Sequence, residues 1–450
     1  MEAGRNRKSA GAHMTLREAL NRTLLLMRDE VDDDATDATL LSALTTTRIA
    51  LVADDLSLRS HAAQTAFVAA AMLMARSGHQ VFLVAPDLPL AGSQPPLGRG
   101  KIIRRLMAIS DDLLPGVRFI AGAPLEPIDL AIAFGGSPLT VRATRRIRLS
   151  AGRWSGHLAP AGEPMEWGEI RSPIGALVSA VLAAGEAFKM AMFKLRPFAR
   201  NPKRFDDLFA ETDKLSFEIA PRDTPLATKI GDLDCISGGA ITNALLYVLS
   251  CIPGVRGEVR VVDSDIADIS NLNRYMLLLR SHLGRAKAYD LADVCRVWFR
   301  IEPIAKRYEP ETLTDLAPLA PSVIVGVDDI PSRWAVQSAN PLWLGVGATT
   351  HWSAMASFHR AGLGCARCLH PHDDPGDAPI PTVAFVSFWA GLLTAVQLLR
   401  HLAGGEPPVN EQQTYLTALR PENPFLSPIP ILPACPICRL NASKAGIVAA

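Results

Sequence analysis

The 450-residue sequence has almost no net charge, few cysteines and no recognisable targeting segment. Lys and Arg total 46 and Asp and Glu total 45, which leaves a net charge of +1. Without an overall basic field, the chain is expected to bind neither nucleic acid nor an anionic membrane surface, so a charged ligand must be recognised locally. Seven cysteines in so long a chain do not make a disulfide scaffold, although four of them form two CxxC pairs.

The sequence is also poor in segments that could cross or enter a membrane. The first 20 residues are basic but no apolar run follows them, so no secretory signal is expected and a cytoplasmic location is predicted. Residues 382–399 carry no charge over 18 residues, the minimum for a transmembrane helix. They contain two threonines, a serine and a glutamine, and a helix apolar on most sides also suits the centre of a large domain. A buried helix is therefore favoured over a membrane span.

The chain contains an internal repeat. Apolar residues make up 48% of it, enough for the packed cores of two or three domains of about 150 residues. A strand, a helix and a second strand are expected in residues 48–87 and again in residues 233–265. Further matches follow in the same order: residues 129–138 with 322–333, the segment around Trp154 with that around Trp352, and an apolar helix at 172–189 with one at 382–399.

Alternating strands and helices predict an α/β fold with two Rossmann-like, doubly wound halves. Residues 194–214 have mixed charge and two prolines, which is typical of a linker. We therefore divide the chain into an N-terminal half with its linker, residues 1–214, and a C-terminal half, residues 215–450.

A candidate ligand site lies in the C-terminal half. In open α/β sheets, ligands bind at the carboxyl ends of strands, where a helix N-terminus offers backbone N–H groups. The turn 237–242 contains Gly238 and Gly239, but Ser and Thr replace the first and last glycines of a GxGxxG pattern. A plain tight turn explains it about as well as a phosphate site. Asp263, at the end of the next strand, either binds a ribose or caps a turn.

Four motifs then occur in a fixed order. They are Asp263-Ser264-Asp265, SNLNRY from Ser270 to Tyr275, GRAKA from Gly284 to Ala288, and DDIPSR from Asp328 to Arg333. With these motifs, about residues 225–440 resemble the ThiF family, adenylating enzymes that include bacterial sulfur-carrier activators and ubiquitin-activating enzymes. The resemblance implies ATP-dependent adenylation of the C-terminal carboxylate of a ubiquitin-like or sulfur-carrier-like protein or peptide.

The resemblance also implies roles for individual residues. The implied nucleotide-binding residues are Gly238 and Gly239 in the turn, Asp263 at the ribose, Asp265 near the metal and phosphates, and Asn271, Arg274 and Lys287 at the triphosphate. Arg274, Lys287 and Asp328 would carry the chemistry, with Asp328 binding Mg²⁺, because cations neutralise phosphate charge and carboxylates suit a hard metal. Arg333 is expected to order its own helix or the neighbouring loop. For any single one of these residues, a surface salt bridge is the alternative.

The two CxxC pairs predict a metal site. Cys365 and Cys368 form the first pair, and Cys435 and Cys438 form the second. Four thiolates suit a tetrahedral structural Zn²⁺ with no open position, and a redox disulfide is the alternative. ThiF-like proteins commonly carry this arrangement. Such a site would hold the C-terminal tail against the domain and take no part in catalysis.

Two features depart from the family pattern. Many relatives form a thioester on a cysteine in the loop after the first CxxC, but residues 370–385 contain no cysteine. Cys235, Cys251 and Cys295 are expected to be buried structural thiols, so adenylation without an enzyme thioester is predicted.

The second departure concerns the first half. It lacks the SNLxR, GxxKA and CxxC motifs and resembles an inactive adenylation-type half, which predicts a monomer with an internal pseudo-dimer. Relatives pass an arginine from the N-terminal region to the ATP of the other half. Arg22 and Arg59 are candidates, although each is expected to be a solvated surface residue.

Two other functions stay open. A non-catalytic ThiF-like module would capture a precursor peptide and deliver it to a partner enzyme, and the altered glycine turn and missing loop cysteine favour this reading. A nicotinamide dehydrogenase would explain the strand–turn–helix but neither the SNLNR motif nor the cysteines. For the adenylating enzyme, a downstream conjugating or modifying enzyme is a further expected partner.

Overall fold

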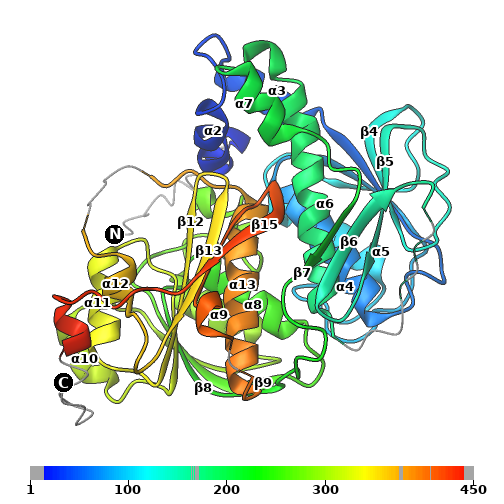
Figure 1. Ribbon diagram of the computed structural model, residues 1–450. Coiled ribbons are helices and arrows are strands. Elements are labelled where there is room, and N and C mark those ends of the chain that lie inside the picture. The colour runs from blue at the N-terminus through cyan, green and yellow to red at the C-terminus, as the bar shows by residue number, and fades with distance from the viewer. Residues whose placement is uncertain are drawn as a thin grey trace, which may run out of the picture.

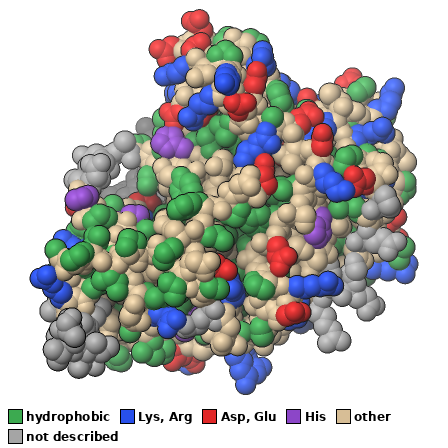
Figure 2. All heavy atoms as spheres, in the orientation of Figure 1, with side chains coloured by type: hydrophobic (Ala, Val, Ile, Leu, Met, Phe, Trp, Pro, Cys, Tyr) green, Lys and Arg blue, Asp and Glu red, His purple; other side chains and the backbone are tan. Residues whose placement is uncertain are grey.

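The computed structural model describes residues 15–163, 165, 167, 172–373, 379–405 and 407–439. It contains two mixed sheets with helices packed between and around them (Figure 1). Acidic and basic side chains are interspersed over the face in Figure 2, including the projecting lobe that contains α2 (Asn21–Arg28), α3 (Asp37–Thr45) and α7 (Pro202–Phe209). This mixture agrees with a net charge near zero.

The N-terminal sheet has seven strands in the order β3-β2-β1-β4-β5-β6-β7. They are β1 (Arg48–Val52), β2 (Gln80–Val84), β3 (Phe119–Ala121), β4 (Ile128–Phe134), β5 (Ala143–Ala151), β6 (Ser155–Pro160) and β7 (Leu215–Glu218). The strands from β3 to β5 are parallel to their neighbours, whereas β6 and β7 are antiparallel. The helices of this half include α4 (His61–Arg76), α5 (Ile102–Leu113) and α6 (Ile174–Phe193).

The C-terminal sheet has eight strands in the order β10-β9-β8-β11-β12-β13-β14-β15. They are β8 (Lys229–Ile236), β9 (Arg256–Val262), β10 (Arg300–Ile304), β11 (Ser322–Val325), β12 (Trp343–Thr350), β13 (Ser353–His359), β14 (Gln413–Thr417) and β15 (Arg420–Ser427). The last three strands are antiparallel. The helices are α8 (Ala240–Ser250), α9 (Lys287–Cys295), α10 (Pro310–Leu316), α11 (Ile330–Ser338), α12 (Ala366–Leu369) and α13 (Ala384–Leu402).

The two sheets share one topology, which confirms the predicted α/β fold with two Rossmann-like halves. From β3 to β7, each strand of the first sheet has a counterpart from β10 to β14, and β15 is an addition to the second sheet. Trp154 and Trp352, paired in the sequence repeat, are both buried and each stands directly before the first antiparallel strand. The helices that close the repeats are α6 and α13.

The halves share one hydrophobic core. Helices α6 and α13 contact each other between the sheets, as Figure 1 shows. The ring of Phe188 in α6 lies 5.5 Å from that of Phe385 in α13 and 5.6 Å from that of Trp352. Both helices are long and apolar enough to cross a membrane, but 94% and 89% of their apolar windows are buried inside the protein. The expectation of a buried helix at residues 382–399 is therefore confirmed.

The segment between the halves is packed. Residues 194–214, interpreted as a linker, contain α7, whose Phe205 and Phe209 are fully buried. The Phe209 ring lies 5.4 Å from that of Trp352, so aromatic packing fixes this segment against the C-terminal half. The first sheet ends with β7, just beyond residue 214, and the proposed division of the chain near residue 215 stays a prediction.

Replacing Phe188 by alanine tests the shared core. The side chain is fully buried, so its truncation is expected to cost about 3–5 kcal/mol in the free energy of unfolding. Urea unfolding, followed by tryptophan fluorescence and circular dichroism, is expected to show one transition for both halves. The control Phe425→Ala, at a side chain that is 60% exposed, is expected to change stability by less than about 0.5 kcal/mol. Two separate transitions in the unmodified protein would contradict a shared core.

Candidate functional site

A pocket of about 380 Å³ lies at the carboxyl ends of β8, β9, β11 and β12. This is the edge at which open α/β sheets bind their ligands. The predicted site residues that line it are Gly239, Asp263, Asp265, Arg274, Lys287 and Asp328. Gly238 and Asn271 are not among the lining residues.

The glycine turn is held by its own side chains. Ser237 has a φ of 97°, a left-handed conformation that favours glycine, and it stands where the GxGxxG pattern has its first glycine. The Gly238 N–H donates to Asp263 Oδ2 at 2.6 Å, and the Gly239 N–H donates to Ser237 Oγ at 3.0 Å. The N-terminus of α8 lines the pocket with Ala240 and Ile241, whereas the two partnered donors belong to the turn before the helix.

Asp263 caps the glycine turn, one of the two roles considered for it, and its role at a ribose stays a prediction. Besides Gly238, it accepts the Asp265 N–H on Oδ1 at 2.8 Å, so it does cap the turn. An ionised carboxylate has about four lone-pair sites, which leaves acceptor capacity for a ligand hydroxyl. Burial raises the pKa of Asp263 despite the nearby positive charge of Lys287.

Lys287 is a charged group at the pocket wall. Its Nζ donates to Asp265 Oδ2 at 2.7 Å and lies 5.8 Å from the centre of the Tyr275 ring. Burial alone would lower the pKa of this lysine, but Tyr275, Asp263 and Asp265 together outweigh burial and raise it. The ammonium group therefore keeps its charge at neutral pH.

The SNLNRY motif forms a compact loop beside the pocket. Arg274 lines the pocket, and its guanidinium donates to the Ser270 carbonyl and, at 2.8 Å, to Asn273 Oδ1. Burial lowers the pKa of Arg274 from its usual high value. Asn271, predicted to hold the triphosphate, accepts the Asp268 N–H at 2.9 Å in a capping box and is not among the residues that line the pocket.

Arg22 lies in the pocket wall, contrary to the expectation of a solvated surface residue. The physical reason is that α2 is fixed to the C-terminal half. Thr23 Oγ1 accepts from Asn273 Nδ2 at 2.9 Å, and the Arg22 carbonyl accepts the Thr382 N–H at 3.2 Å. The other candidate, Arg59, forms an exposed ion pair with Asp55.

Sequence reasoning missed several residues of the pocket. Lys306, Arg307 and Tyr308 line it directly after β10, and Tyr275 lines it within the SNLNRY loop. The position of the first three just beyond a predicted strand end was a usable signal, because the carboxyl ends of parallel strands share one edge.

Asp328 is exposed at the pocket and precedes α11. Arg333 donates twice to the Val327 carbonyl, at 3.1 and 2.8 Å, and contacts His370 Nε2 at 3.0 Å. The prediction that Arg333 orders the neighbouring loop is confirmed.

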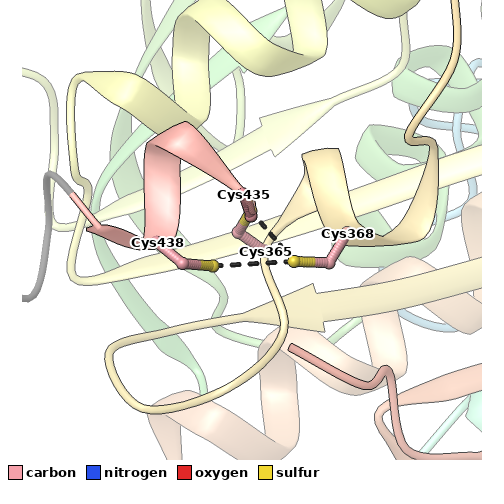
Figure 3. Close-up of side chains that lie close together, drawn as sticks. All are labelled: Cys365, Cys368, Cys435 and Cys438. Carbon is pink, nitrogen blue, oxygen red and sulfur yellow. Dashed lines mark hydrogen bonds between the residues drawn. The ribbon is translucent and has the colours of Figure 1, made fainter. Parts of the chain in front are cut away.

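The four cysteines of the CxxC pairs form one cluster (Figure 3), with ligand atoms all within 4.8 Å of one another. The sulfur of Cys365 lies 3.7 Å from that of Cys368 and 3.4 Å from that of Cys435, and Cys368 lies 3.6 Å from Cys438. Tetrahedral thiolates on zinc, with Zn–S near 2.3 Å, place sulfurs about 3.8 Å apart. A disulfide requires about 2.05 Å. The donor set and its spacing fit zinc.

The other three cysteines are buried in the C-terminal half, as predicted. Cys235 lies in β8, Cys251 caps the end of α8 and Cys295 ends α9. Burial raises the pKa of all three thiols, that of Cys295 to about 12. They are protonated and poorly nucleophilic at neutral pH.

Two family models match the chain. Residues 239–435 match the ThiF family, and residues 48–203 match the BilD N-terminal domain. An uncharacterized protein, y4jF of Sinorhizobium fredii, is 24% identical over 221 residues, covering 48% of this chain and 42% of that protein. The adenylyltransferase and sulfurtransferase MOCS3 of Sus scrofa is 28% identical, covering 36% of this chain and 39% of its own. The chain thus spans less than half of these relatives.

Two further similarities complete the comparison. The sulfur carrier protein adenylyltransferase of Thermus thermophilus is 27% identical, covering 45% of this chain and 79% of that protein. The crystal structure of E. coli MccB matches with a TM-score of 0.40 and 15% identity, covering 64% of this chain and 96% of that one. Superposition at this score is too loose to transfer features of MccB to this chain.

Metal analysis tests the cysteine cluster. The purified protein is expected to hold about one zinc per chain, and Cys438→Ser is expected to lose it and to lower the melting temperature, because the tetrahedral site loses a ligand. Elemental analysis and thermal melting measure both effects. The control Cys295→Ala, outside the cluster, is expected to keep its zinc. Metal-free protein with the four cysteines paired as disulfides would contradict the prediction.

Proposed function

Because residues 239–435 form a ThiF family domain, we propose that this chain is an ATP-dependent adenylyltransferase. It would activate the C-terminal carboxylate of a ubiquitin-like or sulfur-carrier-like protein or peptide. The observation that carries this proposal is the convergence of cationic side chains, among them Arg22, Arg274 and Lys287, with Asp263 and Asp328 in one pocket. Such a set suits a polyanionic ligand that also carries hydroxyl groups and a metal.

Different residues of the pocket suit different parts of an ATP molecule. Asp263, deep at the end of β9, would accept the ribose hydroxyls, as a strand-terminal acid does in dinucleotide folds. Arg22, Arg274 and Lys287 would bind the triphosphate. Asp328 would hold Mg²⁺ with Asp265 nearby, since both carboxylates are exposed at the pocket. The ion, when bound, would supply further neutralisation of phosphate charge.

The reaction that fits these residues is acyl-adenylate formation. An oxygen of the substrate carboxylate attacks the α-phosphorus of ATP, and a new O–P bond forms. The bond from that phosphorus to the oxygen bridging to the β-phosphate breaks, and pyrophosphate leaves with the electron pair. This step needs positioning and charge neutralisation, without a protein nucleophile. The described lining residues include neither His nor Cys, which supports such a mechanism.

The cysteines support adenylation without an enzyme thioester. Four of the seven belong to the metal-type cluster and three are buried thiols with raised pKa values. Residues 374–378 of the crossover loop lie outside the described residues, and the sequence of that loop contains no cysteine.

Further features belong to the same proposal. Zn²⁺ in the cysteine cluster would tie the C-terminal segment to α12. The shared core between the halves supports a monomer whose N-terminal half, residues 1–214, replaces a second subunit of the adenylation domain, residues 215–450. A cytoplasmic location is part of the same proposal. A conjugating or modifying enzyme would receive the activated acyl group.

A second candidate is the non-catalytic peptide-binding module. The observation that favours it is the glycine turn, in which Asp263 and Ser237 accept the N–H groups of Gly238 and Gly239 and so leave fewer backbone donors for a phosphate. Arg22, Arg274, Lys287 and Asp328 have no evident role in a module that only binds a peptide.

Isotope exchange between pyrophosphate and ATP tests the activity. With a carrier protein or peptide that ends in a free carboxylate, exchange is expected in the unmodified enzyme. Arg274→Ala is expected to reduce it at least about a hundredfold, the scale on which single transition-state charge contacts act. Arg59→Ala, at an exposed ion pair, serves as a matched arginine control and is expected to exchange normally. Binding of the peptide without exchange under any condition would favour the second candidate.

The absence of a thioester has its own test. After incubation with ATP and the carrier, non-reducing electrophoresis and intact mass are expected to show no adduct that a thiol reagent releases. A cysteine-linked adduct on this chain, lost on treatment with dithiothreitol, would contradict this part of the proposal.

A further inference from the structure

The loop that carries Arg274 is held by the N-terminal half at three places. Asn273 donates to Thr23 of α2 at 2.9 Å. Ser281, after the loop, donates to the carboxylate of Asp112 in α5 through its N–H at 2.7 Å and its hydroxyl at 2.5 Å. The third contact comes from Arg76, the last residue of α4.

Arg76 reaches from its helix into the loop. It is fully buried, and its guanidinium donates to the carbonyl oxygens of Leu272 and Leu278, each at 2.6 Å, and of Met276 at 3.3 Å. These three carbonyls flank Arg274 and Tyr275 along the chain, and both of those residues line the pocket. One rigid, planar group thus fixes the backbone on both sides of a pocket cation.

A contact that only joined the two halves would not need this chemistry. Phe188 and its aromatic neighbours show that apolar packing already joins them. Burying a guanidinium costs free energy unless its donors are satisfied. The two terminal nitrogens of Arg76 donate to carbonyls of one short segment, whereas its buried Nε has no hydrogen-bond partner among the described residues. Burial lowers its pKa to about 9, so it is charged at neutral pH.

We propose that Arg76 is a positioning residue, through which the N-terminal half sets the conformation of residues 272–278 and so the place of Arg274 in the nucleotide pocket. The expected effect on nucleotide binding rests on the proposed function, whereas the expected effect on the loop concerns the protein without nucleotide. The N-terminal half then shapes the site as well as packing against the C-terminal half.

The test combines two readouts on Arg76→Met and Arg76→Lys. Hydrogen exchange of the apo protein is expected to be faster across residues 272–281 in Arg76→Met, because amides such as those of Tyr275 and Leu278 are protected by hydrogen bonds within this loop. Calorimetric titration is expected to show Mg-ATP binding weakened about tenfold, which corresponds to about 1.4 kcal/mol. Arg76→Lys keeps the charge but can form fewer hydrogen bonds, so its loop exchange and its affinity are expected to lie between those of the unmodified protein and those of Arg76→Met. It also serves as the test variant if Arg76→Met fails to fold.

The matched control is His61→Gln, at the other end of α4. The two ring nitrogens of His61 lie 2.7 Å from the carbonyl oxygens of Ala91 and Cys251, so this residue joins the halves without touching the loop. It is expected to lower the melting temperature with loop exchange and nucleotide affinity unchanged.

The outcomes are separable. If both Arg76 variants lose only thermal stability, as His61→Gln does, with exchange and affinity unchanged, the positioning role is overturned. If the unmodified protein does not bind Mg-ATP, the proposed function fails, and the exchange measurement alone decides whether Arg76 orders the loop.

Discussion

The contact between the two halves is the constraint on which the rest of the structure depends. Helices α6 and α13 are apolar on nearly all sides, and neither half could leave its helix exposed to water. Their packing around Phe188, Phe385 and Trp352 makes one core from two repeats. This contact also holds α2, α4 and α5 against the C-terminal half. Arg22 therefore reaches the pocket, and Arg76 and Asp112 reach the segment 272–281 beside it.

The pocket itself follows from the topology. Four strand ends of the C-terminal sheet meet at one edge, and each delivers a polar residue there without long loops. The equivalent edge of the N-terminal sheet is built differently. There Trp167 stacks on Phe134 at 6.2 Å beside Gly135, so an aromatic side chain lies where β4 ends. The repeat therefore preserves the scaffold, whereas the pocket lined by cationic residues lies at the edge of the C-terminal sheet.

Local patterns predicted much of the fold and part of the site. The four matched segments of the repeat gave the correct equivalence of strands, and the spacing within each CxxC pair indicated a cluster that joins cysteines 70 residues apart. Asp263, Arg274 and Lys287 were predictable because each stands in a short motif next to a strand or helix end. Those positions are fixed by local geometry.

The errors arose where distant contacts decide. Arg22 faces the pocket because Thr23 bonds to Asn273, 250 residues away, and no local pattern encodes that. Asn271 differs for a local reason, because its amide completes a capping box with Asp268, three residues away, and its role at the triphosphate stays a prediction. The segment at 194–214 has the composition of a linker, but Phe205 and Phe209 find partners only in the folded chain.

Titration of Mg-ATP into the purified protein and into Asp328→Ala is the most direct test of a working nucleotide site. The account predicts micromolar affinity in the unmodified protein, about −8 kcal/mol, and its loss in the variant. The absence of binding to either protein would contradict it and would favour the non-catalytic peptide-binding module.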